Sequence, residues 1–107
     1  MEKMLFYHGE TTDNVRFTIA GHFEEDEIIL GLALCSKNDQ FCKKLGRIKA
    51  AGRSYSKRGR SGMSTINLYK DTMPENYWVG KETRIFRDAV SNFENMKSLE
   101  LKQEFNF

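Results

Sequence analysis

The chain has 107 residues, of which 39% are hydrophobic and 30% are charged. This length allows one domain with a modest core and excludes two. No apolar run approaches the roughly 18 residues that a membrane-spanning helix needs, and the first residues lack the pattern of a secretory signal. One proline and two cysteines exclude a proline-rich linker and a disulfide framework. We therefore expect a single domain over residues 1–107, in the cytoplasm, with reduced thiols and no membrane partner.

Charge is distributed unevenly along the chain. The formal net charge is +2, but Lys37–Arg60 alone carries +8, from nine basic residues and one acidic residue. Residues 1–36 carry −5 and residues 61–107 carry −1. A concentrated basic segment of this kind indicates an anionic partner, which can be a nucleotide, a nucleic acid or an acidic protein surface.

The first third of the chain predicts three strands. Leu5–Tyr7 is a short apolar run, and Val15–Phe23 alternates in a way that is typical of a half-buried strand. The four acids Glu24–Glu27 predict an exposed hairpin loop, because burying four like charges is costly. Ile28–Cys35 is the most apolar run and has small residues on one side, which predicts either a strand covered on both faces or a central strand with small residues beneath a helix, paired antiparallel with Val15–Phe23.

A helix should follow, because apolar residues recur three and four positions apart. Ser36, Asn38 or Asp39 would cap its first turn. The stripe expected to face the sheet consists of Phe41, Leu45, Ile48, Gly52 and Tyr55. Gly52 would allow the helix to approach the sheet closely. The other side would carry Lys43, Lys44, Arg47, Lys49 and Arg53.

The rest of the chain predicts further elements in a regular order. Ser54–Ser64 predicts a loop, and strands are expected at Ser64–Lys70 and Tyr77–Val79, with a turn at Asp71–Asn76 between them. Glu82–Lys97 has helical spacing of its apolar residues. The last residues, Leu99, Leu101, Phe105 and Phe107, alternate with polar ones and predict a C-terminal strand. The expected fold is therefore α+β, with an antiparallel or mixed sheet of four to five strands covered by two helices.

The basic helix and the loop after it are the strongest candidate for a binding site. Arginine can form two charge-assisted hydrogen bonds with a phosphate, amides beside glycine can form an anion nest, and aromatic rings can stack on a base. The candidate ligand-binding residues are Arg47, Arg53, Lys57, Arg58, Arg60, Tyr55, Gly59 and Trp78. The alternatives are a solvated helix face for the basic residues and a place in the core for the aromatic ones.

No catalytic or metal-binding signature accompanies these residues. His8, His22, Cys35 and Cys42 do not have the spacing of a zinc site, and the acidic run Glu24–Glu27 alone does not supply converging calcium ligands. The glycine spacing matches no phosphate-binding fingerprint. We therefore expect a protein that is not an enzyme and that uses no cofactor and no metal.

The segment Ile29–Arg53 resembles a pattern found in small bacteriophage-encoded proteins. In that pattern an apolar strand ends in cysteine, and a short polar link leads to an Asp two positions before a Phe, followed by Gly, Ala and Arg on a helix. The matching residues here are Cys35, Asp39, Phe41, Gly46, Ala50 and Arg53. Such proteins include anti-defence sponges, which bind cyclic-nucleotide or ADP-ribose-type immune signals without cleaving them, often as oligomers. The resemblance implies a location in the host cell cytoplasm.

Three functions follow from these observations. The first, which the resemblance implies, is the sequestration of a small phosphate-bearing ligand. The second is a nucleic-acid-binding module that uses the basic helix and loop, although the acidic flanks would repel a duplex. The third is a phage inhibitor that binds a host defence protein.

We also expect a homo-oligomer. The acidic run Glu24–Glu27 and the basic run Lys57–Arg60 are complementary between copies if they lie at opposite ends of the sheet. The predicted C-terminal strand would be an apolar edge that is costly to leave unpaired. Apolar contact would hold the copies together, because exposed ion pairs contribute only about 0–1 kcal/mol each.

Overall fold

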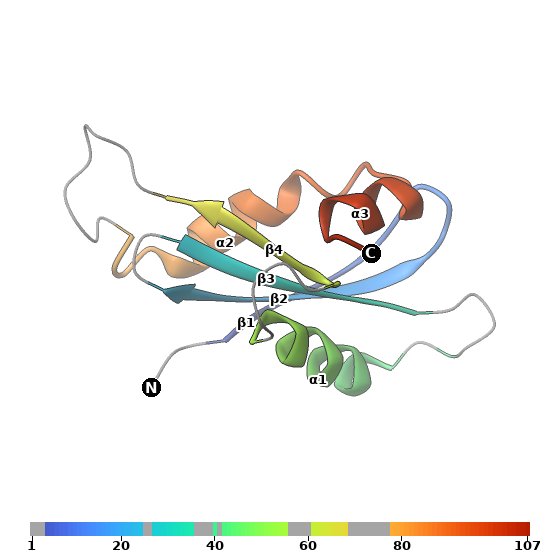
Figure 1. Cartoon of the computed structure of the whole chain (residues 1–107), viewed down its shortest axis with the longest axis horizontal. Coiled ribbons are helices and arrows are strands. Elements are labelled where there is room, and N and C mark those ends of the chain that lie inside the picture. The colour runs from blue at the N-terminus through green and yellow to red at the C-terminus, as the bar shows by residue number, and fades with distance from the viewer. Residues whose placement is uncertain (1–3, 25–26, 36–39, 41, 56–60, 69–77) are drawn as a thin grey trace.

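Four antiparallel strands form one sheet in the order β1-β2-β3-β4. The computed structural model describes residues 4–24, 27–35, 40, 42–55, 61–68 and 78–107. The strands are β1 (Leu5–Glu10), β2 (Arg16–Glu24), β3 (Glu27–Leu34) and β4 (Met63–Asn67), and the helices are α1 (Lys43–Ser54), α2 (Glu82–Ser91) and α3 (Ser98–Glu104). Helix α1 covers one face of the sheet, and α2 and α3 cover the other (Figure 1). The predicted α+β class is confirmed.

The first three strands form two hairpins whose pairing agrees with the sequence pattern. β1 continues to Glu10, three residues beyond the predicted end, because Leu5 to Glu10 pair with Gly21 to Arg16 of β2. β2 and β3 pair antiparallel, as predicted, from Phe17–Leu34 to Glu24–Glu27. Glu24 and Glu27 therefore flank the hairpin loop, and Glu25 and Asp26 lie outside the described residues. The prediction that β2 is half-buried is wrong, because helices cover the sheet on both sides and every residue from Phe17 to Phe23 is buried.

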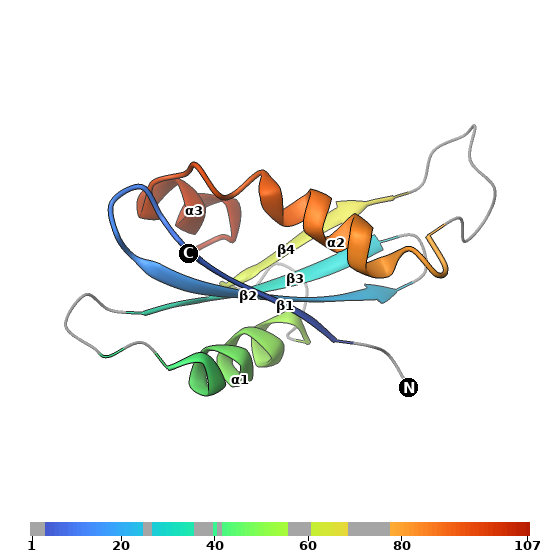
Figure 2. The ribbon, with the colours of Figure 1, turned by 180° about the vertical axis from the view of Figure 1, so that it is seen from behind.

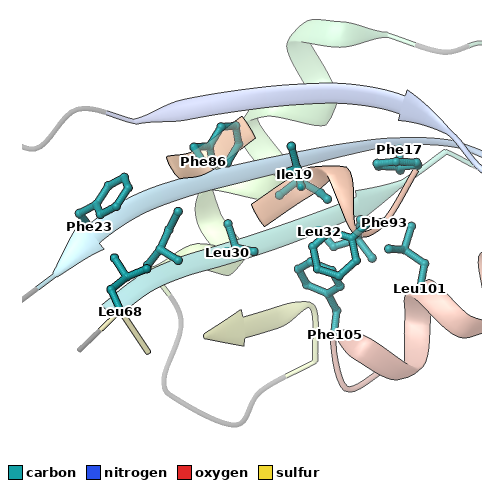
Figure 3. Close-up of a cluster of buried hydrophobic side chains, with 12 residues drawn as sticks. Phe17, Ile19, Phe23, Leu30, Leu32, Leu68, Phe86, Phe93, Leu101 and Phe105 are labelled. Carbon is teal, nitrogen blue, oxygen red and sulfur yellow. The ribbon is translucent and has the colours of Figure 1, made fainter. Parts of the chain in front are cut away.

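Large apolar side chains fill the space between the sheet and helices α2 and α3 (Figure 3). β2 and β3 direct alternate residues to this side, as the two-residue period of a strand requires. The helices contribute Phe86 and Val90 from α2, and Leu101 from α3, followed by Phe105. The buried cluster consists of Phe17, Ile19, Phe23, Ile28, Leu30, Leu32, Leu68, Phe86, Val90, Phe93, Leu101 and Phe105. This is the main core of the domain.

Small residues form the contact between the sheet and α1. Alternate residues of β2 and β3 on this side are Thr18, Ala20, Gly31 and Ala33. Ala50 and Ser54 are the buried residues of α1. The approach is close, since a Cβ added at Gly31 would collide with the backbone oxygen of Ala50 and would lie 2.5 Å from the backbone nitrogen of Ser54. The prediction of small residues beneath a helix is therefore confirmed.

The predicted buried stripe of α1 is wrong. Leu45, Ile48 and Tyr55 are 49%, 59% and 57% exposed, and a Cβ added at Gly52 would meet no atom within 4 Å. The side that faces the sheet carries Gly46, whose added Cβ would collide with the Thr18 side chain, and Ala50. The physical reason is the shallow surface of the sheet: small residues on both partners bring the backbones together, whereas Leu45 and Ile48 would hold them apart.

The start of α1 also differs from the prediction. Its N-cap residue is Cys42, which is in an extended conformation and makes no capping hydrogen bond with its side chain. Ser36, Asn38 and Asp39 precede this position by at least three residues, so none of them is the N-cap. Those three residues and Phe41 lie outside the described residues.

The described part of the second half of the chain contains one more helix and fewer strands than predicted. β4 begins at Met63, and Tyr69 and Lys70 lie outside the described residues, as does the predicted turn at 71–76. Trp78–Gly80 is a turn rather than a strand, and α2 ends at Ser91 rather than Lys97. The apolar residues predicted for α2 nevertheless point inward, since Phe86, Val90 and Phe93 are buried.

The predicted C-terminal strand is wrong, because residues 98–104 form α3. Leu, Glu, Lys and Gln favour helix, and the segment has no β-branched residue to favour a strand. Leu101 and Phe105, which are four positions apart, are fully buried, whereas Leu99 is 66% exposed. The residues that alternate in the sequence therefore include a pair, Leu101 and Phe105, with the spacing of one helix turn. Because no terminal strand is formed by residues 98–104, the edge-strand argument for an oligomer no longer holds.

Asp13 holds the start of α3 against the turn between β1 and β2. Its Oδ1 accepts hydrogen bonds from Ser98 N at 2.8 Å and Thr11 Oγ1 at 2.6 Å, and its Oδ2 accepts one from Ser98 Oγ at 2.5 Å. Hydrogen bonds to the charged carboxylate, first from the Ser98 hydroxyl and then from Thr11, hold the pKa of Asp13 well below its usual range. Thr12 N also donates to Met96 O at 3.1 Å. These contacts position the last helix.

Candidate anion-binding site

Helix α1 carries five basic residues and no acidic residue. They lie on more than one side of the helix. The charge of Arg47 acts on His8 of β1, at one edge of the sheet. Arg53 contacts Leu32 of β3 and Phe107 instead. The helix therefore has a basic flank toward β1 that is separate from its contacts with β3 and the C-terminus.

A recess of about 280 Å³ lies on the β1 side of the start of α1. His8, Gly9, Glu10, Arg16 and Lys43 line it, so two strands and the helix contribute to it. Glu10 and Arg16 are paired residues of the β1–β2 hairpin, and His8 lies two residues before Glu10 on the same face. His8 Nδ1 and Thr18 Oγ1 are 2.8 Å apart and share a hydrogen bond. Three basic side chains thus meet one carboxylate in this recess.

The electrostatic environment of the recess favours an anion. Partial burial, and then the positive charges of Lys43 and Arg47, lower the pKa of His8 below its usual value of 6.5. The first turn of α1 has no acidic residue, its N-cap residue Cys42 makes no side-chain capping hydrogen bond, and Lys43 lies at this positive end of the helix dipole. A negative group placed there would interact favourably with Lys43, Arg47 and the helix dipole.

Arg53 has a packing role that the sequence did not reveal. Its Nη1 donates a hydrogen bond of 2.6 Å to the backbone oxygen of Leu32, and its guanidinium lies 5.3 Å from the centre of the Phe107 ring. A Cβ added at Gly62 would lie 2.5 Å from Cδ of Arg53. The structure therefore separates Arg53 from Arg47, although both are predicted ligand-binding residues.

The two aromatic candidates lie on opposite sides of the sheet. Tyr55 stacks on His22 on the α1 side, with ring centres 4.3 Å apart. His22 is fully buried, and its ring nitrogens have no hydrogen-bond partner in the described part of the chain, although Glu24 Oε1 lies 3.6 Å from Nε2. Trp78 stacks on Phe23, 5.0 Å between centres, and packs against the main core. The structure therefore does not bring Trp78 to the basic helix.

The remaining predicted site residues, Lys57, Arg58, Gly59 and Arg60, lie outside the described residues. Conversely, sequence reasoning missed His8 and Arg16 as partners of the basic helix. The signal was present in the alternation of Val15–Phe23, which puts Arg16 and Thr18 on one side. Pairing that strand with a first strand extended beyond Tyr7 would have brought His8 beside them.

A second recess, of about 470 Å³, lies at the start of α2. It is lined by Gly80, Lys81, Glu82, Thr83, Arg84, Arg87 and Asp88. Two of these residues are acidic, and Glu82 Oε1 already accepts a hydrogen bond of 3.1 Å from Gly80 N. A carboxylate of the chain thus occupies the position where an anion would bind, so the recess at α1 is the better candidate.

Within the described ranges, no three His, Cys, Asp or Glu side chains lie close enough together to hold a metal ion. Cys35 and Cys42 do not form a disulfide, and Cys42 is exposed. None of the described helices has the length and apolar character needed to cross a membrane.

Comparisons with protein-family models, curated proteins and solved structures find no match for this chain. Three residues of the phage-protein pattern have packing roles in the structure. Gly46 lies against Thr18, Ala50 is buried between the helix and the sheet, and Arg53 donates a hydrogen bond to the backbone oxygen of Leu32. Packing of α1 on the sheet is therefore a sufficient reason for these three residue types.

Proposed function

We propose that the recess beside the start of α1 binds the phosphate group of a small anionic ligand, and that the protein sequesters this ligand without converting it. The observation that carries the proposal is the convergence of His8, Arg16 and Lys43 at a helix start that has no acidic residue. Arg47 adds charge from the next turn of the helix. A phosphate would accept charge-assisted hydrogen bonds from these side chains.

The size of the recess favours a small part of the ligand rather than the whole of it. Drug-sized ligands usually occupy about 300–1,000 Å³, and this recess has a volume of about 280 Å³. A phosphodiester or a diphosphate would fit in it, and the rest of the ligand would lie along the exposed surface. Cyclic nucleotides and ADP-ribose-type signals, the ligand class suggested by the phage-sponge resemblance, have this form.

Ligand binding should be coupled to proton uptake by His8. The positive charges of Lys43 and Arg47 help to lower the pKa of His8, and a bound anion would offset them. The pKa of His8 would then rise on binding, so affinity should increase as the pH falls from 8 toward 6. A phosphodiester ligand keeps its own charge across this range, which makes it a clean probe of the effect.

Calorimetry can test the site with a cyclic dinucleotide, ADP-ribose and inorganic phosphate at fixed salt. The double variant Lys43→Ala with Arg47→Ala should weaken binding about tenfold or more, as expected when charged partners of a phosphate are removed. The control, Lys44→Ala with Lys49→Ala, has the same net charge and should bind within about twofold of the wild type. Glu10→Gln should tighten binding, because it removes the one carboxylate of the recess.

The outcomes separate this proposal from its alternatives. Equal losses in both double variants, together with a steep salt dependence, would indicate a diffuse surface for nucleic acid. If neither double variant changes the affinity for any of the three ligands, the recess is not the site. Recovery of intact ligand after heating the complex is expected, and recovery of a cleaved product would identify an enzyme.

A further inference from the structure

The outward side of α1 carries an apolar stripe of Leu45, Ile48, Gly52 and Tyr55, of which Tyr55, at the end of the helix, also stacks on His22 of β2. Leu45, Ile48 and Tyr55 are each about half exposed, at 49%, 59% and 57%. The opposite side of α1 already holds the helix on the sheet through Ala50 and Ser54. Figures 1 and 2 show the outward side of α1 directed away from the sheet and from the other helices. Leu45 and Ile48 belong to neither buried cluster and are therefore surplus to the core, and exposed apolar side chains grouped in this way mark interaction sites.

The spacing of the stripe matches that of a helix–helix contact. Leu45, Ile48, Gly52 and Tyr55 follow one another at steps of three, four and three, which are the steps of the a and d positions in a coiled coil. A Cβ added at Gly52 would meet no atom within 4 Å, so the surface is open at that position. The segment spans about 16 Å, or three helical turns. A partner helix of similar length would cover it.

The charge around the stripe defines the chemistry of the partner. Lys44 and Lys49 are exposed on α1 beside the apolar residues, and the helix has no acidic residue. We propose that the outward face of α1 docks an acidic amphipathic helix of another protein, with apolar residues against Leu45 and Ile48 and carboxylates beside the two lysines. This inference is independent of the anion-binding recess, which lies on the β1 side of the helix.

Two other occupants are less compatible with these observations. A second copy of the chain would present an α1 helix of the same positive charge, and like charges across an interface are costly. A membrane-surface helix buries a broad apolar face in the lipid, whereas α1 offers a narrow stripe and has its other side packed on the sheet. Both remain outcomes of the test.

Fluorescence anisotropy with the full chain and synthetic peptides tests the proposal. The panel contains helical peptides of three heptads with Leu, Ile or Met at a and d and Glu at e and g, and matched peptides with Lys at e and g. We expect at least one acidic peptide to bind with a Kd below about 100 µM. Its Lys counterpart should bind at least about tenfold more weakly.

Paired variants locate the binding face. Leu45→Ser with Ile48→Ser should weaken binding of the acidic peptide about tenfold or more. The control, Val79→Ser with Leu99→Ser, alters two apolar residues that are 62% and 66% exposed elsewhere, and should have no effect. Lys44→Glu with Lys49→Glu should reverse the preference, so that the Lys peptide binds more tightly than the acidic one. This variant removes no apolar contact, so it tests the same face even if the serine variant folds poorly.

The proposal is overturned if no acidic peptide binds, or if the serine variant binds as well as the wild type. It is also overturned if sedimentation shows a dimer that the serine substitutions dissociate, because a second copy then covers the stripe. The stripe would instead be assigned to a lipid surface if phosphatidylserine-containing vesicles capture the wild-type protein but not the serine variant, and no peptide binds.

Discussion

The two faces of the sheet use different side chains to hold their helices. Toward α2 and α3, the sheet presents Phe17, Ile19 and Leu32, and large residues of the helices, such as Phe86, pack against them (Figure 3). Toward α1 the contact is made by alanine, glycine and serine, and backbones approach each other directly. One face is stabilised mainly by the area it buries, and the other by the fit of its shape.

This difference explains why α1 has large side chains that are exposed instead of packed in the core. A helix that docks through small residues leaves its long side chains for other contacts. On α1 these are the basic flank beside β1 and the apolar stripe on the outside. By contrast, α2 and α3 bury Phe86, Val90 and Leu101 in the core. This difference predicts that binding depends on the α1 side and stability mainly on the other side, and substitutions on each face can test this division.

The largest loss of stability should follow Phe105→Ala on the large-residue face. Phe105 is fully buried and its ring centre lies 5.2 Å from that of Phe93. Removing such a ring leaves a cavity and typically costs about 3–5 kcal/mol. Leu99→Ala, at an exposed site of α3, should change stability by no more than about 0.5 kcal/mol. Denaturant unfolding measures both, and a cost below about 1 kcal/mol for Phe105→Ala would mean that α3 is not part of the core.

On the small-residue face, adding volume should be harmful. In Gly31→Ala the new methyl would meet the backbone of α1 at Ala50 and Ser54, and neither atom can move without shifting the helix. Overpacking of this kind typically costs about 1–3 kcal/mol. Gly52→Ala is the matched control, since its methyl would enter open space and should stabilise the helix by about 0.5–1 kcal/mol. Two thermal melts compare them, and equal effects would contradict the close packing of α1.

The sequence was sufficient to predict the elements that depend on local pattern. β2, β3 and their antiparallel pairing follow from alternation, and Gly31 and Ala33 correctly indicated a helix above them. The failures concern which partner surface each side chain meets. Periodicity shows that α1 has two sides, but only the shape of the sheet decides that Ala50, rather than Ile48, is buried.

The same limit applies to the candidate site. Arg47 could be selected from its helix, whereas His8 and Arg16 join it only through the register of the β1–β2 hairpin. Arg53 looked equivalent to Arg47 in the sequence, and its bond to Leu32 depends on a long-range contact. Likewise, the alternation near Leu101 and Phe105 fits a strand or a helical pair. The contact with the sheet and the Asp13–Ser98 hydrogen bonds favour the helix.

The smallest expected effect is also the most direct test of the α1 orientation. If the stripe predicted from the sequence were core, Leu45→Ala would cost about 2–5 kcal/mol. In the structure Leu45 is 49% exposed, and alanine is at least as good a helix former, so the change in stability should stay within about 0.5 kcal/mol. Equilibrium unfolding in urea, with Phe105→Ala as the positive reference, can distinguish these values. A loss above about 2 kcal/mol would show that α1 is rotated from the described orientation, and would also remove the outward stripe as a docking surface.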